Sequence, residues 1–95
     1  MYLQLFLKFE GDIHYMTYST VIIKRISDVC DERNITVNKL ATLSGINQST
    51  VRDIMKGYSR NPRLDTLHKI ATGLGMTVSE FLNFPAMNET IFEDE

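Results

Sequence analysis

A short stretch in the middle of the chain carries side chains that could recognise the edges of nucleic-acid bases. Gln48, Ser49, Arg52 and Asp53 recur at a spacing that places them on one face of a helix. Gln can form two hydrogen bonds with adenine, Arg can form two with guanine, and Ser adapts to several bases. This face therefore suits base reading in a major groove, although an ordinary solvated helix face has the same polar pattern.

Positive charge gathers around the same stretch, even though the whole chain is slightly acidic. The chain has 95 residues and a formal net charge of −2. Residues 16–85 contain nine Lys or Arg against six Asp or Glu, a net charge of +3, whereas residues 86–95 contain four acids and no base. The cations near the polar face are Lys39, Arg52, Lys56, Arg60 and Arg63. Local charge density governs phosphate attraction better than the total charge, so nucleic acid is not excluded.

Two short helices joined by a tight turn would position these residues. The apolar residues of the first helix repeat at helical spacing and are Val37, Leu40, Ala41 and Leu43. Gly45 is expected to end it, because glycine readily adopts the left-handed conformation that closes a helix. Asn47 is the expected N-cap of the second helix, with its side chain accepting from the backbone amides of Ser49 or Thr50. The inward residues of that helix would be Val51, Ile54 and Met55.

From Val21 to Phe84 the chain resembles the lambda-repressor and Cro-like helix-turn-helix family, also called xenobiotic-response-element regulators. The resemblance runs in order and without gaps over about two-thirds of the chain. The matching residues are Leu40-Ala41, Ser44-Gly45-Ile46, Ser49-Thr50-Val51, Ile54, Lys56-Gly57, Asn61-Pro62, Leu64, Leu67, Ile70-Ala71, Leu74-Gly75 and Val78 through Leu82. It implies an all-α, five-helix lambda-repressor-like DNA-binding domain with a helix-turn-helix.

The resemblance also implies a function and a division of roles among the site residues. The residues expected to face bases are Gln48, Ser49, Arg52 and Asp53. The residues expected at the DNA backbone are Lys39, Asn47, Thr50, Lys56, Tyr58, Arg60 and Arg63, although Tyr58 could equally pack on the core. The expected protein is a sequence-specific transcriptional regulator of bacterial or phage type, in particular a repressor, that binds double-stranded DNA as a homodimer. The alternative is a protein-interaction module on the same fold, such as the antitoxin of a toxin–antitoxin pair.

The chain departs from the family pattern at two places. Many family members have an Arg at the position of Cys30 and a Glu at that of Met55, which form an internal ion pair. Here both residues are apolar, which avoids leaving one buried charge unpaired. Val37 stands where many relatives have a Gln that contacts a phosphate. We therefore expect Asn38 or Lys39 to take over part of that contact, or the affinity to be lower.

Three further helices should complete the domain, which is expected to span residues 16–85. The first is expected over Thr20 to Asn34 with Ser19 or Thr20 as its cap, and its core face consists of Ile22, Ile26, Val29 and Cys30. The fourth is expected to have Pro62 in its first turn, and its core face consists of Leu64, Leu67, Ile70, Ala71 and Leu74. Thr77 and Glu80 predict a capping box at the start of the fifth helix, and Phe84-Pro85 is expected to end the fold.

Both ends of the chain differ in character from this domain. Residues 2–9 alternate weakly like a strand, which would dock on the helices, pair with a second copy or stay loose. Residues 1–15 form an N-terminal extension that need not be native, and Met16 is an alternative start. Residues 86–95 form an acidic tail that contains Met87, Ile91 and Phe92. Such a tail is usually solvated, but these apolar residues would also allow it to dock on a protein partner or on the other subunit.

The sequence offers no basis for an enzyme, a metal site or a cofactor. It lacks a Ser/His/Asp or Cys/His set, a phosphate-cradling glycine loop and a cluster of metal ligands. Cys30 has no second cysteine to pair with and lies on an apolar stripe, so we expect it to be a small buried core residue. No apolar run is long enough to span a membrane. A cytoplasmic location is therefore expected.

Overall fold

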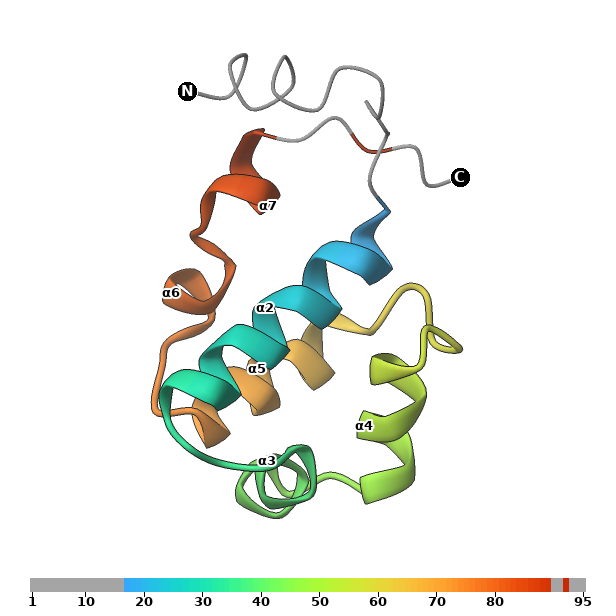
Figure 1. Cartoon of the computed structure of the whole chain (residues 1–95), viewed down its shortest axis with the longest axis vertical. Coiled ribbons are helices and arrows are strands. Elements are labelled where there is room, and N and C mark those ends of the chain that lie inside the picture. The colour runs from blue at the N-terminus through green and yellow to red at the C-terminus, as the bar shows by residue number, and fades with distance from the viewer. Residues whose placement is uncertain (1–16, 90–91, 93–95) are drawn as a thin grey trace.

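The computed structural model describes residues 17–89 and Phe92, and this part of the chain is all-α. Its helices are α2 (Tyr18–Glu32), α3 (Val37–Ser44), α4 (Gln48–Met55), α5 (Leu64–Gly73), α6 (Val78–Leu82) and α7 (Pro85–Glu89) (Figure 1). The predicted all-α fold is confirmed, and the five predicted helices correspond to α2–α6. The strand and the alternative start predicted within residues 1–16 lie outside the described residues. Within the described part, no helix is long and apolar enough to cross a membrane.

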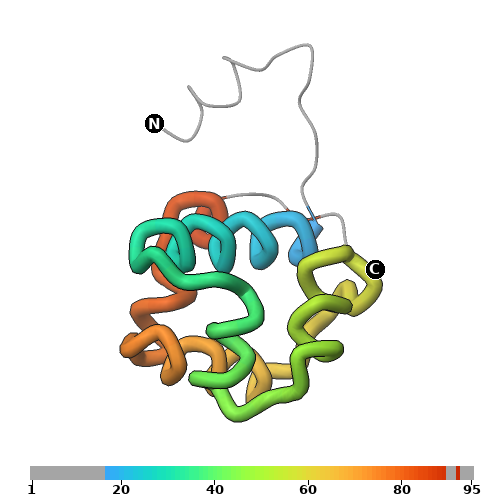
Figure 2. Tube along the Cα trace, turned by 60° about the horizontal axis from the view of Figure 1, so that its bottom comes forward, coloured from blue at the N-terminus to red at the C-terminus, as the bar shows by residue number. Residues whose placement is uncertain are grey.

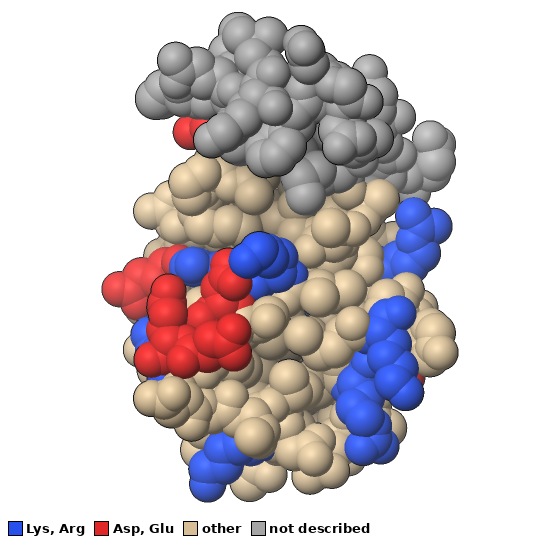
Figure 3. Space-filling view, viewed as in Figure 1, with Lys and Arg blue, Asp and Glu red and all other residues tan. Residues whose placement is uncertain are grey.

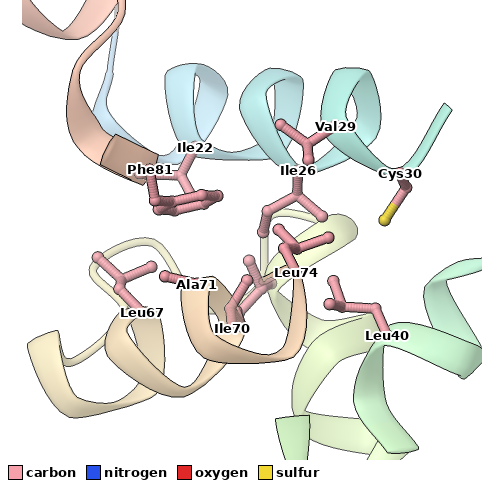
Figure 4. Close-up of a cluster of buried hydrophobic side chains, with 11 residues drawn as sticks. Ile22, Ile26, Val29, Cys30, Leu40, Leu67, Ile70, Ala71, Leu74 and Phe81 are labelled. Carbon is pink, nitrogen blue, oxygen red and sulfur yellow. The ribbon is translucent and has the colours of Figure 1, made fainter. Parts of the chain in front are cut away.

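The core lies between α2 and α5, with α3, α4 and α6 closing its sides. Figure 4 shows side chains of α2 facing those of α5, with Phe81 of α6 between them and Leu40 of α3 at one end. The side chains of Ile26, Ile70 and Phe81 are completely buried. Burying an aliphatic or aromatic side chain of this size contributes about 2 kcal/mol. This core fixes the orientation of the two helices of the helix-turn-helix.

Cys30 and Met55 both pack against this core, as the departure from the family pattern predicted. Cys30 is 3% exposed, and Met55 is half-buried against the same cluster. Burial raises the pKa of the Cys30 thiol above its usual 9.0, and the nearby negative charge of Asp31 raises the pKa further. Cys30 is therefore a protonated core residue, as expected from its place on the apolar stripe.

Helix α2 begins earlier than predicted. Its N-cap is Thr17, whose hydroxyl accepts from the backbone N–H of Thr20 at 3.1 Å. The prediction of Ser19 or Thr20 as the cap was wrong, because extended backbone at Thr17 leaves both residues inside the first turn. Ser19 is buried there.

Helix α5 begins later than predicted. Arg63 has extended backbone (φ −67°, ψ 151°) and is the N-cap, so Pro62 lies before the helix and not in its first turn. Leu64 was predicted to face the core, but it is 67% exposed because the first turn projects beyond the edge of the core. The buried face of α5 consists of Leu67, Ile70, Ala71 and Leu74.

Leu43 of α3 is a second apolar residue that is not buried in the core. Its side chain is 48% exposed, whereas Leu40 and Ala41 are completely buried. At about 100° per residue, Leu43 points roughly 110° away from the direction midway between those two residues. The predicted inclusion of Leu43 in the buried face of α3 was therefore wrong.

Helices α3 and α5 approach each other closely at Gly73. A Cβ atom on Gly73 would lie 2.9 Å from the backbone N and 3.0 Å from the Cα of Ser44. Gly75, with φ +74°, has the left-handed conformation that closes a helix. Gly73 has a different role, because it is the last residue of the helix and leaves room for the backbone of α3.

Arg25 fastens the C-terminal helices to α2. Its guanidinium donates to the carbonyl oxygens of Phe81 at 2.8 Å and Glu80 at 2.9 Å. It also lies over the rings of Phe81 and Phe84, 5.7 Å and 4.7 Å from their centroids. Both carbonyls belong to the end of α6, where carbonyl oxygens lack an α-helical donor, and the Glu80 oxygen also accepts from the backbone N–H of Asn83 at 3.2 Å.

The fold continues beyond Phe84, where the sequence predicted that it ends. Pro85 opens the short helix α7, which packs against α2, and Met87 contacts the core. A proline is well suited to the first turn of a helix, because its missing N–H has no partner to lose there. Thr77 and Glu80 form the predicted capping box of α6, with both of its hydrogen bonds present.

Candidate nucleic-acid interface

The turn between α3 and α4 is built from local backbone chemistry. Thr36 caps α3 by accepting from the N–H of Lys39 at 3.0 Å. Gly45 ends α3 in the left-handed conformation (φ +72°), as predicted. Asn47 is the N-cap of α4, but its side chain accepts no capping hydrogen bond. That part of the prediction was wrong. The backbone carbonyl of Asn47 instead accepts from the amides of Thr50 and Val51, so the side chain is left outward.

Helix α4 presents one polar face to the outside. Val51 and Ile54 are buried, and they fix the rotation of the helix about its axis. All four residues predicted to read bases are therefore exposed: they are Gln48, Ser49, Arg52 and Asp53. In Figure 2 the turn and α4 lie at the edge of the molecule, on the side away from α6 and α7. The described elements leave this face uncovered.

The loop after α4 (residues 56–63) is hydrogen-bonded to the end of that helix. The backbone carbonyl of Asp53 accepts from the amides of both Tyr58 at 2.9 Å and Ser59 at 3.1 Å. Gly57, in the left-handed conformation (φ +80°), makes this reversal, and Ser19 of α2 lies beside it. The loop is thereby held next to the polar face of α4 and against the start of α2 (Figure 2).

The loop and its surroundings expose the residues predicted at the DNA backbone. Lys39, Asn47, Thr50, Lys56, Arg60 and Arg63 are all exposed. Tyr58 is 74% exposed, so the alternative that it packs on the core is wrong. Figure 3 shows Lys and Arg gathered on the side that α4 and the loop form. Asp and Glu gather elsewhere, over the C-terminal half of α2 and over α6.

The cations of this surface are mostly available for an external anion. Arg63 pairs with Asp65 at 3.1 Å, and both side chains are largely exposed. Among residues 17–89 and 92, no ion pair joins Arg52, Lys56 or Arg60 to a carboxylate. Asp53 likewise has no ion pair with its neighbours in this part of the chain. Its carboxylate is therefore exposed on the same surface as the cations.

The sequence predicted which side chains are exposed, but it did not predict the backbone hydrogen bonds that hold the loop beside them. Nothing in the residue types of the loop indicates that the Asp53 carbonyl would accept two hydrogen bonds. Thr17 itself could have indicated the cap of α2, since Thr is a preferred N-cap residue, but Ser19 and Thr20 offered the same side-chain chemistry. The position of Ser19 beside Gly57 depends on packing between distant segments and has no sequence signature.

Comparison with known proteins agrees with this geometry. Residues 25–86 match the family model of the Cro/C1-type HTH DNA-binding domain. An uncharacterised HTH-type transcriptional regulator of Haemophilus influenzae is 34% identical over 70 residues, which cover 74% of this chain and 70% of that protein. The crystal structure of the prophage Lp1 protein 11 superimposes with a TM-score of 0.70 at 35% identity, covering 78% of this chain and 97% of that one.

These matches cover the elements that build the exposed polar face. The family match includes α3, the turn, α4 and the loop after α4. The resemblance read from the sequence is thus confirmed by family, by relative and by structure. The chain belongs to the Cro/C1-type helix-turn-helix family and is a DNA-binding transcriptional regulator.

Proposed function

We propose that α4 enters the major groove of double-stranded DNA and reads bases with Gln48, Ser49, Arg52 and Asp53. The supporting observation is the polar face of α4, which is exposed along its length while Val51 and Ile54 hold the helix in the core. Arg52 can donate hydrogen bonds to the two acceptors of guanine. Gln48 can form hydrogen bonds with both the donor and the acceptor of adenine. Asp53 suits the amino group of cytosine.

The DNA backbone is contacted by the residues that surround this face. They are Lys39, Asn47, Thr50, Lys56, Tyr58, Arg60 and Arg63. Lys39 lies on α3, and the others lie on α4, on the turn before it and on the loop after it, so phosphates on both sides of the groove are within reach. Such contacts fix the register of the protein on DNA without reading sequence.

The protein acts as a homodimer and as a repressor. Two copies related by a two-fold axis would place two α4 helices on half-sites about 34 Å apart, one turn of the duplex. A dimer bound across a promoter blocks transcription by occupying the DNA, without contacting the polymerase. Its place of action is the cytoplasm, where bacterial DNA lies.

Binding of the purified full chain to a library of random duplexes, at several salt concentrations, tests this function. Gln48→Ala or Arg52→Ala should weaken binding to the selected site by about 1–3 kcal/mol and relax discrimination at one base pair. Lys56→Ala or Arg60→Ala should weaken binding to all sequences alike and reduce the salt slope by about one unit.

Lys69→Ala is the matched control, because it removes an exposed cation from α5 outside the proposed surface. It should change neither discrimination nor the salt slope appreciably. If no sequence is enriched, or if the four site variants bind like the wild type, base reading by α4 is wrong. A protein-interaction role would then explain this surface better.

A further inference from the structure

Arg63, the last residue of the loop after α4, forms an ion pair with a carboxylate of its own chain. The Nη2 atom of Arg63 donates to Oδ2 of Asp65 at 3.1 Å. Arg63 is the N-cap of α5 and has extended backbone, and Asp65 stands in the first turn of that helix. The two side chains therefore meet at the start of α5, beside the surface proposed to contact phosphates.

This ion pair distinguishes Arg63 from the other cations of that surface. Among residues 17–89 and 92, Lys39, Lys56 and Arg60 form no ion pair with a carboxylate. Asp53, the acid on the face of α4, has no ion pair there either. Within this part of the chain, Asp65 is therefore the one carboxylate that occupies a cation proposed to contact a phosphate.

The ion pair is open to solvent, so an external anion can displace Asp65 from Arg63. The side chain of Arg63 is 82% exposed and that of Asp65 is 57% exposed. An ion pair between two such side chains is weak and is screened by salt. Phosphate oxygens accept hydrogen bonds from a guanidinium as carboxylate oxygens do. Arg63 can thus exchange the carboxylate for a phosphate without any rearrangement of buried groups.

We propose that Asp65 competes with DNA phosphate for Arg63 and thereby limits the sequence-independent affinity of the protein for DNA. The inference rests on the proposed phosphate contact of Arg63. In the free protein the carboxylate neutralises the guanidinium, so DNA binding gains less from counterion release at this contact. In the complex the displaced carboxylate stays close to the phosphate that replaced it and repels it. Both effects lower the affinity for every sequence alike and leave discrimination between bases to α4.

Asp65→Asn in the full chain removes the charge and keeps the size of the side chain. At low salt the variant should bind the selected duplex and a random-sequence duplex about two- to fivefold more tightly, with an unchanged ratio between the two affinities. The gain should disappear at high salt, because exposed charges are screened there. The salt slope should steepen by up to about one unit, since Arg63 then acts as a full cation. Titrations of both duplexes at several salt concentrations measure all three effects.

The chain offers a matched control in a second exposed ion pair, between Lys24 and Asp28 on α2. The Nζ atom of Lys24 lies 2.7 Å from Oδ1 of Asp28, and the two side chains are 73% and 47% exposed. Asp28→Asn therefore makes the same chemical change in a similar ion pair outside the proposed surface. It should change the affinity for either duplex by less than about 1.5-fold. Thermal melting checks that each variant is folded.

A double-mutant cycle between positions 63 and 65 separates competition from general repulsion. If Asp65 acts through Arg63, Asp65→Asn should change the affinity by less than about 1.5-fold once Arg63 has been replaced by Ala. If Asp65→Asn tightens binding equally with and without Arg63, the carboxylate repels DNA from a distance and the competition is wrong. If Asp65→Asn weakens binding, Asp65 orients Arg63 toward the phosphate, which also overturns the competition.

The proposed phosphate contact of Arg63 is tested separately in the Asp65→Asn background. There, Arg63→Ala should weaken binding to every sequence and flatten the salt slope by about one unit. If it does so while Asp65→Asn alone leaves the affinity unchanged, the phosphate contact stands and the competition fails. If Arg63→Ala changes nothing in either background, the phosphate contact of Arg63 fails, and the competition fails with it.

Discussion

Asp53 is the residue of the recognition surface whose charge opposes its proposed partner. Its carboxylate is exposed among cations and, within the described residues, forms no ion pair with them. It therefore repels phosphate unless a cytosine amino group donates to it in the complex. The cost of this repulsion is acceptable only if the carboxylate contributes to discrimination between bases.

Replacing Asp53 by Asn distinguishes these two situations. If the carboxylate reads a cytosine, the variant should lose about 1–3 kcal/mol on the selected site and change its preference at one base pair. If it does not, the variant should bind every sequence several-fold more tightly at low salt. Binding to the selected duplex and to a scrambled duplex measures both effects, and equal affinity of variant and wild type for both duplexes would contradict a place for Asp53 on the interface.

Cys30 makes stability depend on pH in the alkaline range. Burial raises the pKa of its thiol in the folded state above the 9.0 of the exposed thiol. Above pH 9 the unfolded chain therefore loses a proton that the folded chain keeps, so the free energy of unfolding falls as the pH rises. Below pH 9 this contribution is fully present.

The Cys30→Ala variant should show a smaller loss of stability between pH 8 and about pH 10.5 than the wild type. Denaturant unfolding at a series of pH values measures the difference in stability between the two proteins. Parallel pH curves for the two proteins would mean that the thiol titrates in the folded state as it does in water. At pH 8 the native thiol should also react slowly with thiol reagents.

At the scale of the elements, Gly73 sets how closely α3 and α5 pack. Gly73→Ala would ordinarily favour a helix by roughly 1 kcal/mol, but here the new Cβ would meet the backbone of Ser44 at 2.9 Å. Because backbone cannot rotate away, the helices must separate, and we expect a net loss of about 2–3 kcal/mol. Thermal or denaturant unfolding measures it.

Thr72→Ala is the control for Gly73→Ala, since Thr72 is the exposed neighbour of Gly73 on the same helix. It should change stability by less than about 0.5 kcal/mol. A Gly73→Ala protein as stable as the wild type would show that α3 and α5 can move apart freely. In that case α3 would not be fixed by α5, and the position of the turn would depend on α2 and α4 alone.

Elements were predictable from the sequence where local chemistry determines them. The roles of Gly45 and of the capping box formed by Thr77 and Glu80 were predicted correctly, because each depends only on residues within one turn of helix. The errors lie where a distant segment decides. The start of α5 depends on Arg63 having extended backbone, and α7 exists because Met87 finds a place against the core. A proline can stop one helix and open another, and sequence alone did not tell which happens at Pro85.

At the scale of the molecule, dimerisation would determine which DNA sequences can be bound. Two α4 helices in a two-fold dimer have a fixed separation, so both can occupy the major groove only if the half-sites face the same side of the duplex. Inserting about 5 bp between the half-sites turns one of them to the opposite side. Inserting about 10 bp returns both half-sites to the same side of the duplex but increases the distance between them.

Insertion of half a turn should therefore reduce affinity for the selected site to near that for a single half-site. Gel-shift titration of the original duplex and of the duplexes with half-turn and full-turn insertions measures this loss. Equal affinity for the original and half-turn duplexes would show that each copy binds alone. The individual chain was sufficient to identify α4 and its exposed face. The sequence contains no comparable pattern for a dimer contact, because exposed apolar residues such as Leu43 and Leu64 do not by themselves indicate a partner.

The hydrogen bonds at Asp53 make the position of the loop independent of the side chain at this residue. The loop is held by the backbone carbonyl of this residue, while its side chain projects outward from α4. Exchanging the side chain therefore leaves the loop where it is. New target sequences could be selected by randomising positions 48, 49, 52 and 53 together, while the proposed phosphate contacts of the loop stay unchanged. The side chains that are proposed to read bases can therefore change without changing the loop that is proposed to contact phosphates.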